Sequence, residues 1–259
     1  MGDLPAKPSR YAEVAAELRD EILSGRLPPG VALPSENRLA AQRGVSRDIL
    51  RAALAVLRSE GLITTIKGGS TYIRDRRVVR LSLSQYSRTL HPGPPAPFSA
   101  AAQAAGLVGN VRVVQVERRP ADADVARGLD IPEGDMVIVR ARHMLLDDVE
   151  PETVQISSSM IPLALVEGSP LAADAPLRVY AAFVELGITP TAMNEEVSTR
   201  MPTPEEAETL GLVSGMPVLD IRRVTRDQDG RPIELLRVVA TGDRTVLVYD
   251  DLPITPATN

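Results

Sequence analysis

Two pairs of arginines have a spacing suited to anion recognition, and they lie in different halves of this 259-residue chain. Arg47 and Arg51 are four residues apart, so on a helix they share one face. Arg140 and Arg142 are two residues apart, so on a strand they also share one face. A guanidinium donates paired hydrogen bonds to a phosphate, a carboxylate or the edge of guanine. The sequence therefore predicts two separate sites for anionic partners.

Two predicted helices position Arg47 and Arg51. Ser35 is expected to cap the first, and Gly44 to end it, because a residue without Cβ readily adopts the left-handed conformation. Ser46 is expected to cap the second helix, whose apolar positions follow the helical period: Ile49, Leu50, Ala53, Leu54 and Leu57. This is the spacing of a helix-turn-helix, in which the start of the second helix meets base edges.

A hairpin with glycines at its tip is predicted directly after this helix. Residues 62–66 and 71–73 are rich in β-branched residues, and Lys67-Gly68-Gly69-Ser70 join them. The glycines allow the backbone to approach a phosphate closely, and Lys67 adds charge. The alternative is a small packed module in which Arg47 and Arg51 are a solvated helix face.

Residues 10–74 resemble the N-terminal pattern of the GntR family of bacterial transcriptional regulators. The resemblance rests on Pro29-Gly30, Leu33-Pro34-Ser35-Glu36, Val45-Ser46-Arg47 and Glu60-Gly61-Leu62-Ile63. It implies a winged helix-turn-helix with DNA contacts at Arg38, Ser46, Arg47, Arg51, Lys67, Gly68, Gly69 and Thr71. Asn37 stands where arginine is common, and Asp48-Ile49 replace a usual Thr-Val pair, so the operator sequence stays open.

Composition narrows the class of protein. The chain has no cysteine and only two histidines, which excludes disulfides and cysteine zinc sites and gives no basis for a metal or cofactor. No apolar run reaches membrane-spanning length, and no signal peptide is apparent, so we expect a cytoplasmic protein without membrane association. Residues 1–77 hold 13 Lys+Arg against 9 Asp+Glu (+4), and the remainder 16 against 25 (−9). A basic N-terminal segment followed by an acidic remainder favours nucleic-acid binding by the N-terminal segment alone.

The prolines between residues 92 and 97 indicate a boundary, because they cannot continue a helix or a central strand. We predict a DNA-binding domain over residues 1–76, a linker over 77–97 and a second domain over 98–259. The alternation of residues 81–84 could add an edge strand to the second domain.

The second domain contains an internal repeat. Residues 121–153 align with residues 202–234 at a shift of 81, and the matched positions include Gly134 with Gly215 and Arg142 with Arg223. Each copy is typical of a short acidic-capped helix, a glycine turn, a strand, a polar hairpin and a return strand. Two copies predict one pseudo-symmetric sheet, with a cleft between them.

The strand with Arg140 and Arg142 is predicted to carry the ligand chemistry. Val137, Val139 and Ala141 should share one face, and Ile138 and the two arginines the other. The arginines would repel each other unless an acid or a bound anion lies between them. Glu234, on the return strand of the second copy, could be that acid, and a phosphate or carboxylate effector could fill the same gap. The alternative is an exposed edge strand or an internal Arg–Glu network.

Residues 98–252 resemble the UTRA effector domain of the HutC-like branch of GntR regulators. The resemblance rests on Leu129-x-Ile131-x-x-Gly134, Arg140-x-Arg142, Ile161-Pro162, Arg200-x-Pro202-Thr203 and Gly242-Asp243-Arg244. It implies an α+β protein: a winged helix-turn-helix joined to a mixed α/β domain with an antiparallel sheet, similar to chorismate lyase. It also implies a homodimer and effector contacts at Arg140, Arg142, Ser159, Glu234 and Arg244.

Three functions fit these observations unequally. The first is a repressor that binds a pseudo-palindromic double-stranded operator and responds to a small, anionic effector. The second is a DNA-binding regulator whose C-terminal half only dimerises. The third is an enzyme, which the sequence does not favour, because it shows no Ser-His-Asp set, metal-ligand cluster, phosphate loop or Rossmann glycine pattern. Kinship to a lyase fold does not imply activity.

Overall fold

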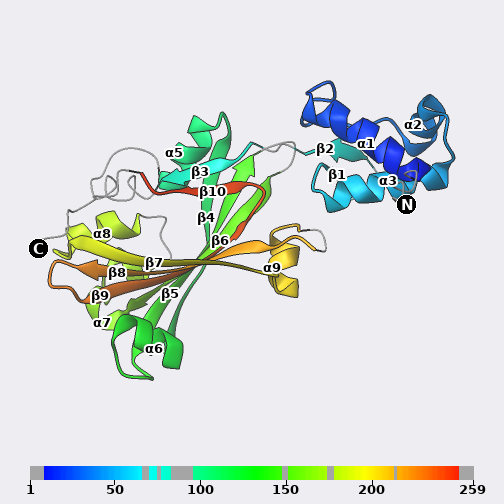
Figure 1. The fold of residues 1–259 in the computed structure, drawn as a ribbon. Helices are drawn as coiled ribbons and strands as arrows, with labels where there is room; N and C mark the ends of the chain where they lie inside the picture. Colours follow the sequence, from blue (N-terminus) through cyan, green and yellow to red (C-terminus); the bar gives the residue numbers. More distant parts are fainter. Residues whose placement is uncertain are drawn as a thin grey trace, which may run out of the picture. The chain divides into compact units, whose positions relative to one another are not determined.

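The computed structural model describes residues 9–65, 70–74, 77–82, 96–147, 151–173, 178–212 and 215–250 (Figure 1). The chain divides into two compact units. The first contains Met1–Arg76 with the short segment Val213–Met216, and the second contains Arg77–Leu212 and Pro217–Asn259. Among the described residues, no helix combines the length and the apolar character that crossing a membrane requires.

Three helices and a hairpin form the first unit. These are α1 (Arg10–Leu23), α2 (Glu36–Arg43), α3 (Arg47–Ser59), β1 (Ile63–Thr65) and β2 (Thr71–Ile73). Leu18, Leu50, Leu57 and Ile63 are among the side chains that close one core between α1, α3 and the hairpin. The predicted helix-turn-helix is therefore present.

The structure confirms the predicted turn and one of the two predicted helix caps. Gly44 ends α2 with φ +61°, in the left-handed region as predicted, and the Ser46 hydroxyl accepts a hydrogen bond from the Ile49 amide at 3.3 Å. Ser35 stands at the N-cap of α2, but its hydroxyl makes no capping hydrogen bond, so that detail of the prediction was wrong. In the wing, β1 and β2 pair antiparallel with Ile63 opposite Ile73. The predicted tip, Lys67, Gly68 and Gly69, lies outside the described residues.

A six-stranded sheet forms the second unit, and each neighbouring pair of strands is antiparallel. The strands are β4 (Val108–Pro120), β5 (Met136–Asp147), β6 (Glu152–Pro162), β7 (Pro190–Arg200), β8 (Val218–Asp227) and β9 (Pro232–Thr241), in the spatial order β4-β5-β6-β9-β8-β7. The predicted α+β class with an antiparallel sheet is confirmed.

The internal repeat is visible in this strand order, and it is longer than the sequence indicated. The helices α6 (Ala123–Leu129) and α9 (Pro204–Thr209) each precede a glycine with φ +90°, Gly134 and Gly215, and then an antiparallel pair of strands. Strands β6 and β9 meet at the centre of the sheet, and β4 and β7 occupy the two equivalent edges. The repeat therefore includes an additional strand before each helix.

The two faces of the sheet are covered by different elements. We call the face that carries Ile138, Arg140, Arg142 and Met144 the cavity face. The 3-10 turn η1 (Pro170–Ala172), α7 (Leu163–Val166) and α8 (Val179–Glu185) pack around Ile138 at one end of it. The helix α5 (Pro97–Ala104) packs near Met144 at the other end. On the opposite face, α6 packs against Val137 and Val139, and Leu210, just after α9, packs against Val239. The predicted division of β5 side chains between two faces is confirmed.

A second, two-stranded sheet lies beside α5. Strand β3 (Val79–Ser82) pairs in parallel with β10 (Thr245–Val248), and Leu81 packs with Phe98 of α5. The sequence predicted that residues 81–84 could add an edge strand to the second domain. A strand of the second unit is present here, but it begins earlier, at Val79, and pairs with β10 in a separate two-stranded sheet. Residues 83–95 of the predicted linker lie outside the described residues.

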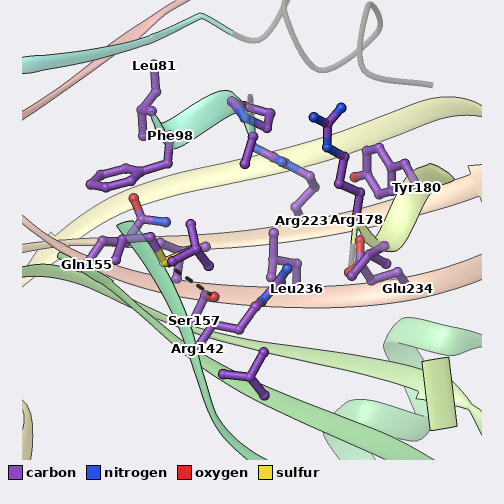
Figure 2. Close-up of a pocket in the computed structure, with 17 residues that line it drawn as sticks. Leu81, Phe98, Arg142, Gln155, Ser157, Arg178, Tyr180, Arg223, Glu234 and Leu236 are labelled. Carbon is purple, nitrogen blue, oxygen red and sulfur yellow. Dashed lines mark hydrogen bonds between the residues drawn. The ribbon is translucent and has the colours of Figure 1, made fainter. Parts of the chain in front are cut away.

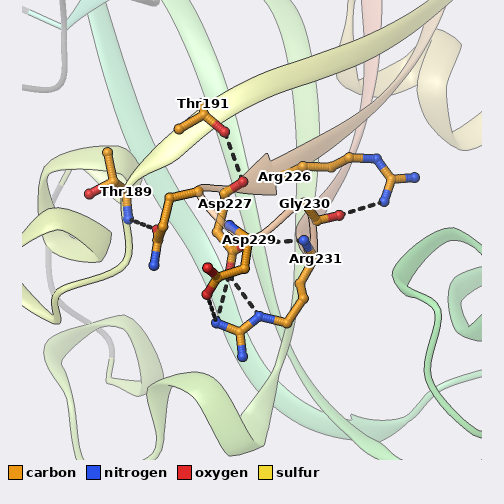
Figure 3. Close-up of polar contacts among 8 residues, drawn as sticks. Thr189, Thr191, Arg226, Asp227, Asp229, Gly230 and Arg231 are labelled. Atoms are coloured by element: carbon orange, nitrogen blue, oxygen red, sulfur yellow. Dashed lines mark hydrogen bonds and ion pairs between the residues drawn. The ribbon is translucent and has the colours of Figure 1, made fainter.

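The turn between β8 and β9 is held by a buried aspartate (Figure 3). Asp227 Oδ1 accepts hydrogen bonds from the amides of Asp229 and Arg231, both at 2.9 Å, and Oδ2 accepts from Arg231 Nε at 3.0 Å. The Thr191 hydroxyl, at the start of β7, donates to the Asp227 carbonyl at 2.8 Å. Asp227 thus fixes both the hairpin and the edge strand beside it.

We expect Asp227→Ala to destabilise the second unit by about 2 to 4 kcal/mol, because two amides and a guanidinium lose a charged acceptor. Burial raises the pKa of Asp227, but the hydrogen bonds from Arg231 and Asp229 outweigh it, so the net pKa is lowered. A lowered folded-state pKa contributes stability at neutral pH that is lost as the pH falls through that pKa. Urea unfolding should therefore show a constant difference from pH 6 to 8 that shrinks below about pH 4. A variant as stable as the wild type at pH 7 would contradict this role.

Candidate functional site

The N-terminal end of α3 presents a polar surface. Arg38, Ser46, Arg47 and Arg51 are all exposed, while the opposite side of α3 is anchored by buried leucines. Arg51 Nε donates to Glu36 Oε2 at 2.8 Å, which links α3 to the first turn of α2. Because exposed ion pairs are weak, this one leaves the guanidinium available to a stronger acceptor. In the wing, Thr71 lies on β2 with its hydroxyl 3.3 Å from that of Thr65.

A cavity of about 240 Å³ lies on the cavity face of the sheet. Its floor is formed by side chains of β4, β5, β6, β8 and β9, and its roof by β3, α5 and α8. Figure 2 shows Leu81 and Phe98 at one end and Arg178, Tyr180 and Glu234 at the other. The predicted cleft therefore exists, and it spans both copies of the repeat.

Arg142 and Glu234 both line this cavity, and Ser159 connects them. Arg142 Nη2 donates to the Ser159 hydroxyl at 3.3 Å, and that hydroxyl donates to Glu234 Oε1. Glu234 is 1% exposed, and its other oxygen, Oε2, has no hydrogen-bond partner among the described residues. The structure thus brings together three of the five predicted effector residues.

Arg140 points elsewhere. Its Nη1 donates to the carbonyls of Leu171 and Ala173 at 2.9 and 2.6 Å, so this buried guanidinium holds the η1 segment instead of facing Arg142. The predicted repulsion between Arg140 and Arg142 is avoided because each has different acceptors. Arg140 does not line the cavity, so its role as an effector contact stays a prediction.

Arg244 is also separate from the cavity. It is 1% exposed, its Nη1 lies 2.5 Å from Glu152 Oε2, and its Nε donates to the Arg77 carbonyl at 3.2 Å. Arg77 Nη1 in turn donates to the Gly106 carbonyl at 2.6 Å. Arg244 therefore anchors the start of the second unit, two residues before β3, and its contact with an effector stays a prediction.

We expect Glu152→Gln to destabilise the second unit by about 2 to 4 kcal/mol, because it leaves the buried Arg244 guanidinium without its counter-charge. Asp229→Asn is the matched control, since its partner Arg231 is 63% exposed and such pairs contribute little. Urea unfolding of both variants measures the difference. Equal stability of the two would show that the buried pair is not structural.

Sequence reasoning missed three cavity residues. Arg178 and Tyr180 come from the roof element α8, and the Tyr180 hydroxyl is 2.9 Å from that of Thr225, which lies opposite Glu234 in the sheet. Arg223 was visible in the alignment of the repeat as the counterpart of Arg142, and that match was the available signal. No pattern in the sequence pointed to α8 as a cavity wall.

The two repeat-related arginines differ in their surroundings. Arg223 lies opposite Glu195 of β7, and its Nε donates to Glu195 Oε2 at 2.6 Å in an ion pair whose side chains are both 4% exposed. Glu195 Oε1 also accepts from the Tyr249 hydroxyl at 2.8 Å, and burial together with Glu195 raises the pKa of Tyr249 to about 12. Arg142 lies opposite Val113 of β4, and no carboxylate among the described residues is within ion-pair distance of it.

A second, wider hollow of about 730 Å³ lies on the opposite face of the sheet. Several of its charged groups are already paired. Arg200 bonds to both Asp220 and Glu206, at 2.7 Å each, and Arg237 pairs with Asp124. No group of metal-ligating side chains occurs among the described residues. The cavity face is therefore the better candidate for a small ligand.

Comparison with known proteins agrees with the division of the chain into two units. Residues 10–73 match the family model described as bacterial regulatory proteins, gntR family, and residues 104–245 match the UTRA domain. The HTH-type transcriptional regulator GgaR of Escherichia coli K12 is 30% identical over 93% of this chain and 90% of its own length. The HTH-type transcriptional repressor NagR of Bacillus subtilis is 28% identical over 92% of this chain and 93% of its own length.

A solved structure is similar to this chain over nearly its whole length. The crystal structure of PhnF from Mycobacterium smegmatis is 26% identical to this chain, with a TM-score of 0.59. The match covers 95% of this chain and 100% of the PhnF chain.

Proposed function

Because this chain belongs to the GntR family of bacterial regulatory proteins, in its HutC-like branch, we propose that it is a repressor controlled by a small anionic effector. As a family member it is a DNA-binding transcriptional regulator. The proposal adds the sign of regulation, the location of the effector and the form of the operator. The repressor role is supported by relatives that are themselves named repressors.

One observation carries the proposal. A single chain holds exposed arginines at the start of α3 and, in its other unit, a cavity lined by three arginines and by the Glu234 carboxylate, one oxygen of which has no hydrogen-bond partner among the described residues. Buried polar groups with unmet hydrogen bonds are costly in a protein that binds nothing there. The cavity therefore favours a ligand-responsive regulator over a DNA-binding protein alone.

We propose that two copies of the chain act together as a homodimer. In this arrangement each copy presents α3 to one half-site, and the operator is a pseudo-palindrome of double-stranded DNA. Arg38, Ser46, Arg47 and Arg51 would contact the half-site, and the wing from Lys67 to Thr71 would contact the backbone beside it. Effector binding would weaken the operator complex by altering how well the two DNA-binding units fit the two half-sites.

Strand β3 provides a route from the cavity to the DNA-binding unit. Leu81 on β3 lines the cavity, and β3 begins three residues after Arg76, the end of the first unit's main segment. Arg244 and Gly106 hold Arg77 at the start of this segment. A ligand that displaces Leu81 would therefore move the chain where it leaves the DNA-binding unit.

The second candidate is a regulator whose C-terminal unit only dimerises. Thermal-shift screening of the purified protein against phosphorylated and carboxylated metabolites separates the two. We expect at least one compound to raise the melting temperature, because a ligand that binds only the folded state stabilises it. If no compound in a broad screen raises the melting temperature, the second candidate is favoured.

Footprinting tests the proposed function most simply. Purified protein should protect an inverted repeat in the DNA next to its own gene, and the protection should weaken when a compound from the thermal-shift screen is added. Protection of a single half-site, or protection that no compound alters, would contradict the proposal.

A further inference from the structure

One side chain at the start of α3 has the opposite charge to its neighbours. Asp48 is the second residue of the helix, it is exposed, and it shares a face with Arg51 three residues later. The side chains and amides expected to contact DNA can all donate hydrogen bonds, and Asp48 is not one of them. A carboxylate only accepts. The presence of Asp48 on this surface therefore requires a separate explanation.

Asp48 does not hold the fold together. Each glutamate among the described residues of the first unit pairs with an arginine: Glu13 with Arg10, Glu17 and Glu21 with Arg43, Glu36 with Arg51 and Glu60 with Arg19. The carboxylates of the two described aspartates, Asp20 and Asp48, have no ion pair or hydrogen bond within the same part of the chain. The pKa of Arg51 is raised mainly by its hydrogen bond to Glu36, and the nearby charge of Asp48 adds to this increase. The Asp48 carboxylate is thus close to Arg51 and open to an outside donor.

A role in helix stability explains only part of this placement. An aspartate in the first turn interacts favourably with the helix dipole. The same charge repels phosphates, however, and opposes the attraction of a helix N-terminus for anions. Ser46 already caps α3 without adding charge. A carboxylate here lowers affinity for DNA in general unless it gains a donor from a base.

The major groove offers few donors to a carboxylate. Guanine presents two acceptors there, and thymine presents an acceptor and a methyl group. Adenine has a donor at N6, but the neighbouring N7 is an acceptor that repels a second carboxylate oxygen. Cytosine presents the N4 amino group without an adjacent ring acceptor in the groove. Cytosine is therefore the base that a carboxylate matches best.

The position of Asp48 on the helix sets the spacing of the contact. Three residues along a helix correspond to about 4.5 Å, which is close to the rise of about 3.4 Å between base pairs. We propose that Asp48 accepts a hydrogen bond from N4 of a cytosine in each operator half-site, about one base-pair step from the pair that Arg51 contacts. This proposal rests on the proposed use of α3 to contact the operator, and it makes Asp48 a determinant of sequence specificity.

Selection from a randomised library of double-stranded DNA tests the proposal with the full-length protein. The wild type should select a motif with an invariant cytosine, and Asp48→Asn should select adenine at that position alone, because an asparagine amide matches adenine N6 and N7. Asp20→Asn is the matched control and should select the wild-type motif. Asp20 is also exposed and unpaired, but it follows Arg19, which bonds to Glu60 at the far end of α3.

Fluorescence anisotropy at fixed salt gives the size of the effect. The wild type should bind the selected site about tenfold more tightly than a site with adenine in place of that cytosine in one half-site. Asp48→Asn should reverse this preference. Asp48→Ala should bind the two sites equally, and it should bind unrelated DNA at least as tightly as the wild type does, because a charge that repels phosphates is gone.

Two results would overturn the proposal. One is the same selected motif for Asp48→Asn as for the wild type. The other is an equal loss of affinity for all sequences in Asp48→Ala together with a lower melting temperature, which would leave Asp48 only a role in helix stability. In both cases the proposed function stands, because the wild type still selects a motif. If the wild type selects no motif at all, the proposed function fails as well.

Discussion

Arg51→Ala is expected to abolish operator binding while leaving both units folded. Arg51 is exposed near the start of α3, and its ion-pair partner within the part of the chain that the structure describes, Glu36, is an exposed carboxylate on α2. Its removal therefore deprives each half-site of a guanidinium without disturbing the core. A bidentate arginine contact to a base discriminates by about tenfold to a hundredfold, and the proposed dimer would lose it twice.

The measurement is fluorescence anisotropy with the footprinted operator at fixed salt, because phosphate contacts make affinity salt-dependent. Arg127→Ala is the matched control, an exposed helical arginine of α6 whose nearest carboxylate is 3.9 Å away. The control should bind as the wild type does. If Arg51→Ala, with an unchanged melting curve, still protected the same site, α3 would not be the reading helix.

Arg142→Met is expected to abolish the effector response while preserving operator binding. Methionine retains much of the apolar stem but removes the charge that has no carboxylate partner among the described residues. A charged hydrogen bond contributes about 1.5 to 3 kcal/mol, so ligand affinity should fall by about tenfold to a hundredfold.

Calorimetry with a compound found by thermal shift measures this loss. Arg118→Met on β4 is the control, because Arg118 is 53% exposed and does not line the cavity. Wild-type ligand affinity in Arg142→Met would place the effector elsewhere in the molecule.

The sequence predicted the N-terminal unit well because its signals are local. Ser46, Gly44 and the apolar period of α3 each act within a few residues, so caps, turn and buried face could be identified without knowledge of distant contacts. Ser35 shows the limit of this approach. It occupies the predicted N-cap, but whether a hydroxyl makes the capping bond depends on its rotamer, which sequence does not specify.

The cavity was predicted less completely than the N-terminal unit because it depends on contacts between distant segments. The faces of β5 follow from alternation, and Glu234 follows from the repeat, so Arg142 and Glu234 could be placed together. The direction of Arg140 depends on carbonyls at residues 171 and 173, which are brought near by η1. The pairing of Arg244 with Glu152 spans 92 residues and leaves no local signal.

The internal repeat also indicated a cavity residue that the sequence analysis did not single out. Arg223 was aligned with Arg142, which indicated a second arginine at the equivalent place in the sheet. What distinguishes the two is the neighbouring strand, Glu195 on β7 against Val113 on β4, and strand adjacency is known only from the fold. The difference between these neighbours is the basis for proposing that the anionic group of an effector meets Arg142.

We propose that occupancy of the cavity controls binding of the operator. This proposal is tested most directly by measuring the operator dissociation constant with and without a saturating cavity ligand, for the wild type and Arg142→Met side by side. We predict that the ligand weakens operator binding by the wild type at least about fivefold, in the range typical of allosteric coupling, and leaves Arg142→Met unaffected. An unchanged dissociation constant for the wild type, with calorimetry showing the ligand bound, would contradict the account.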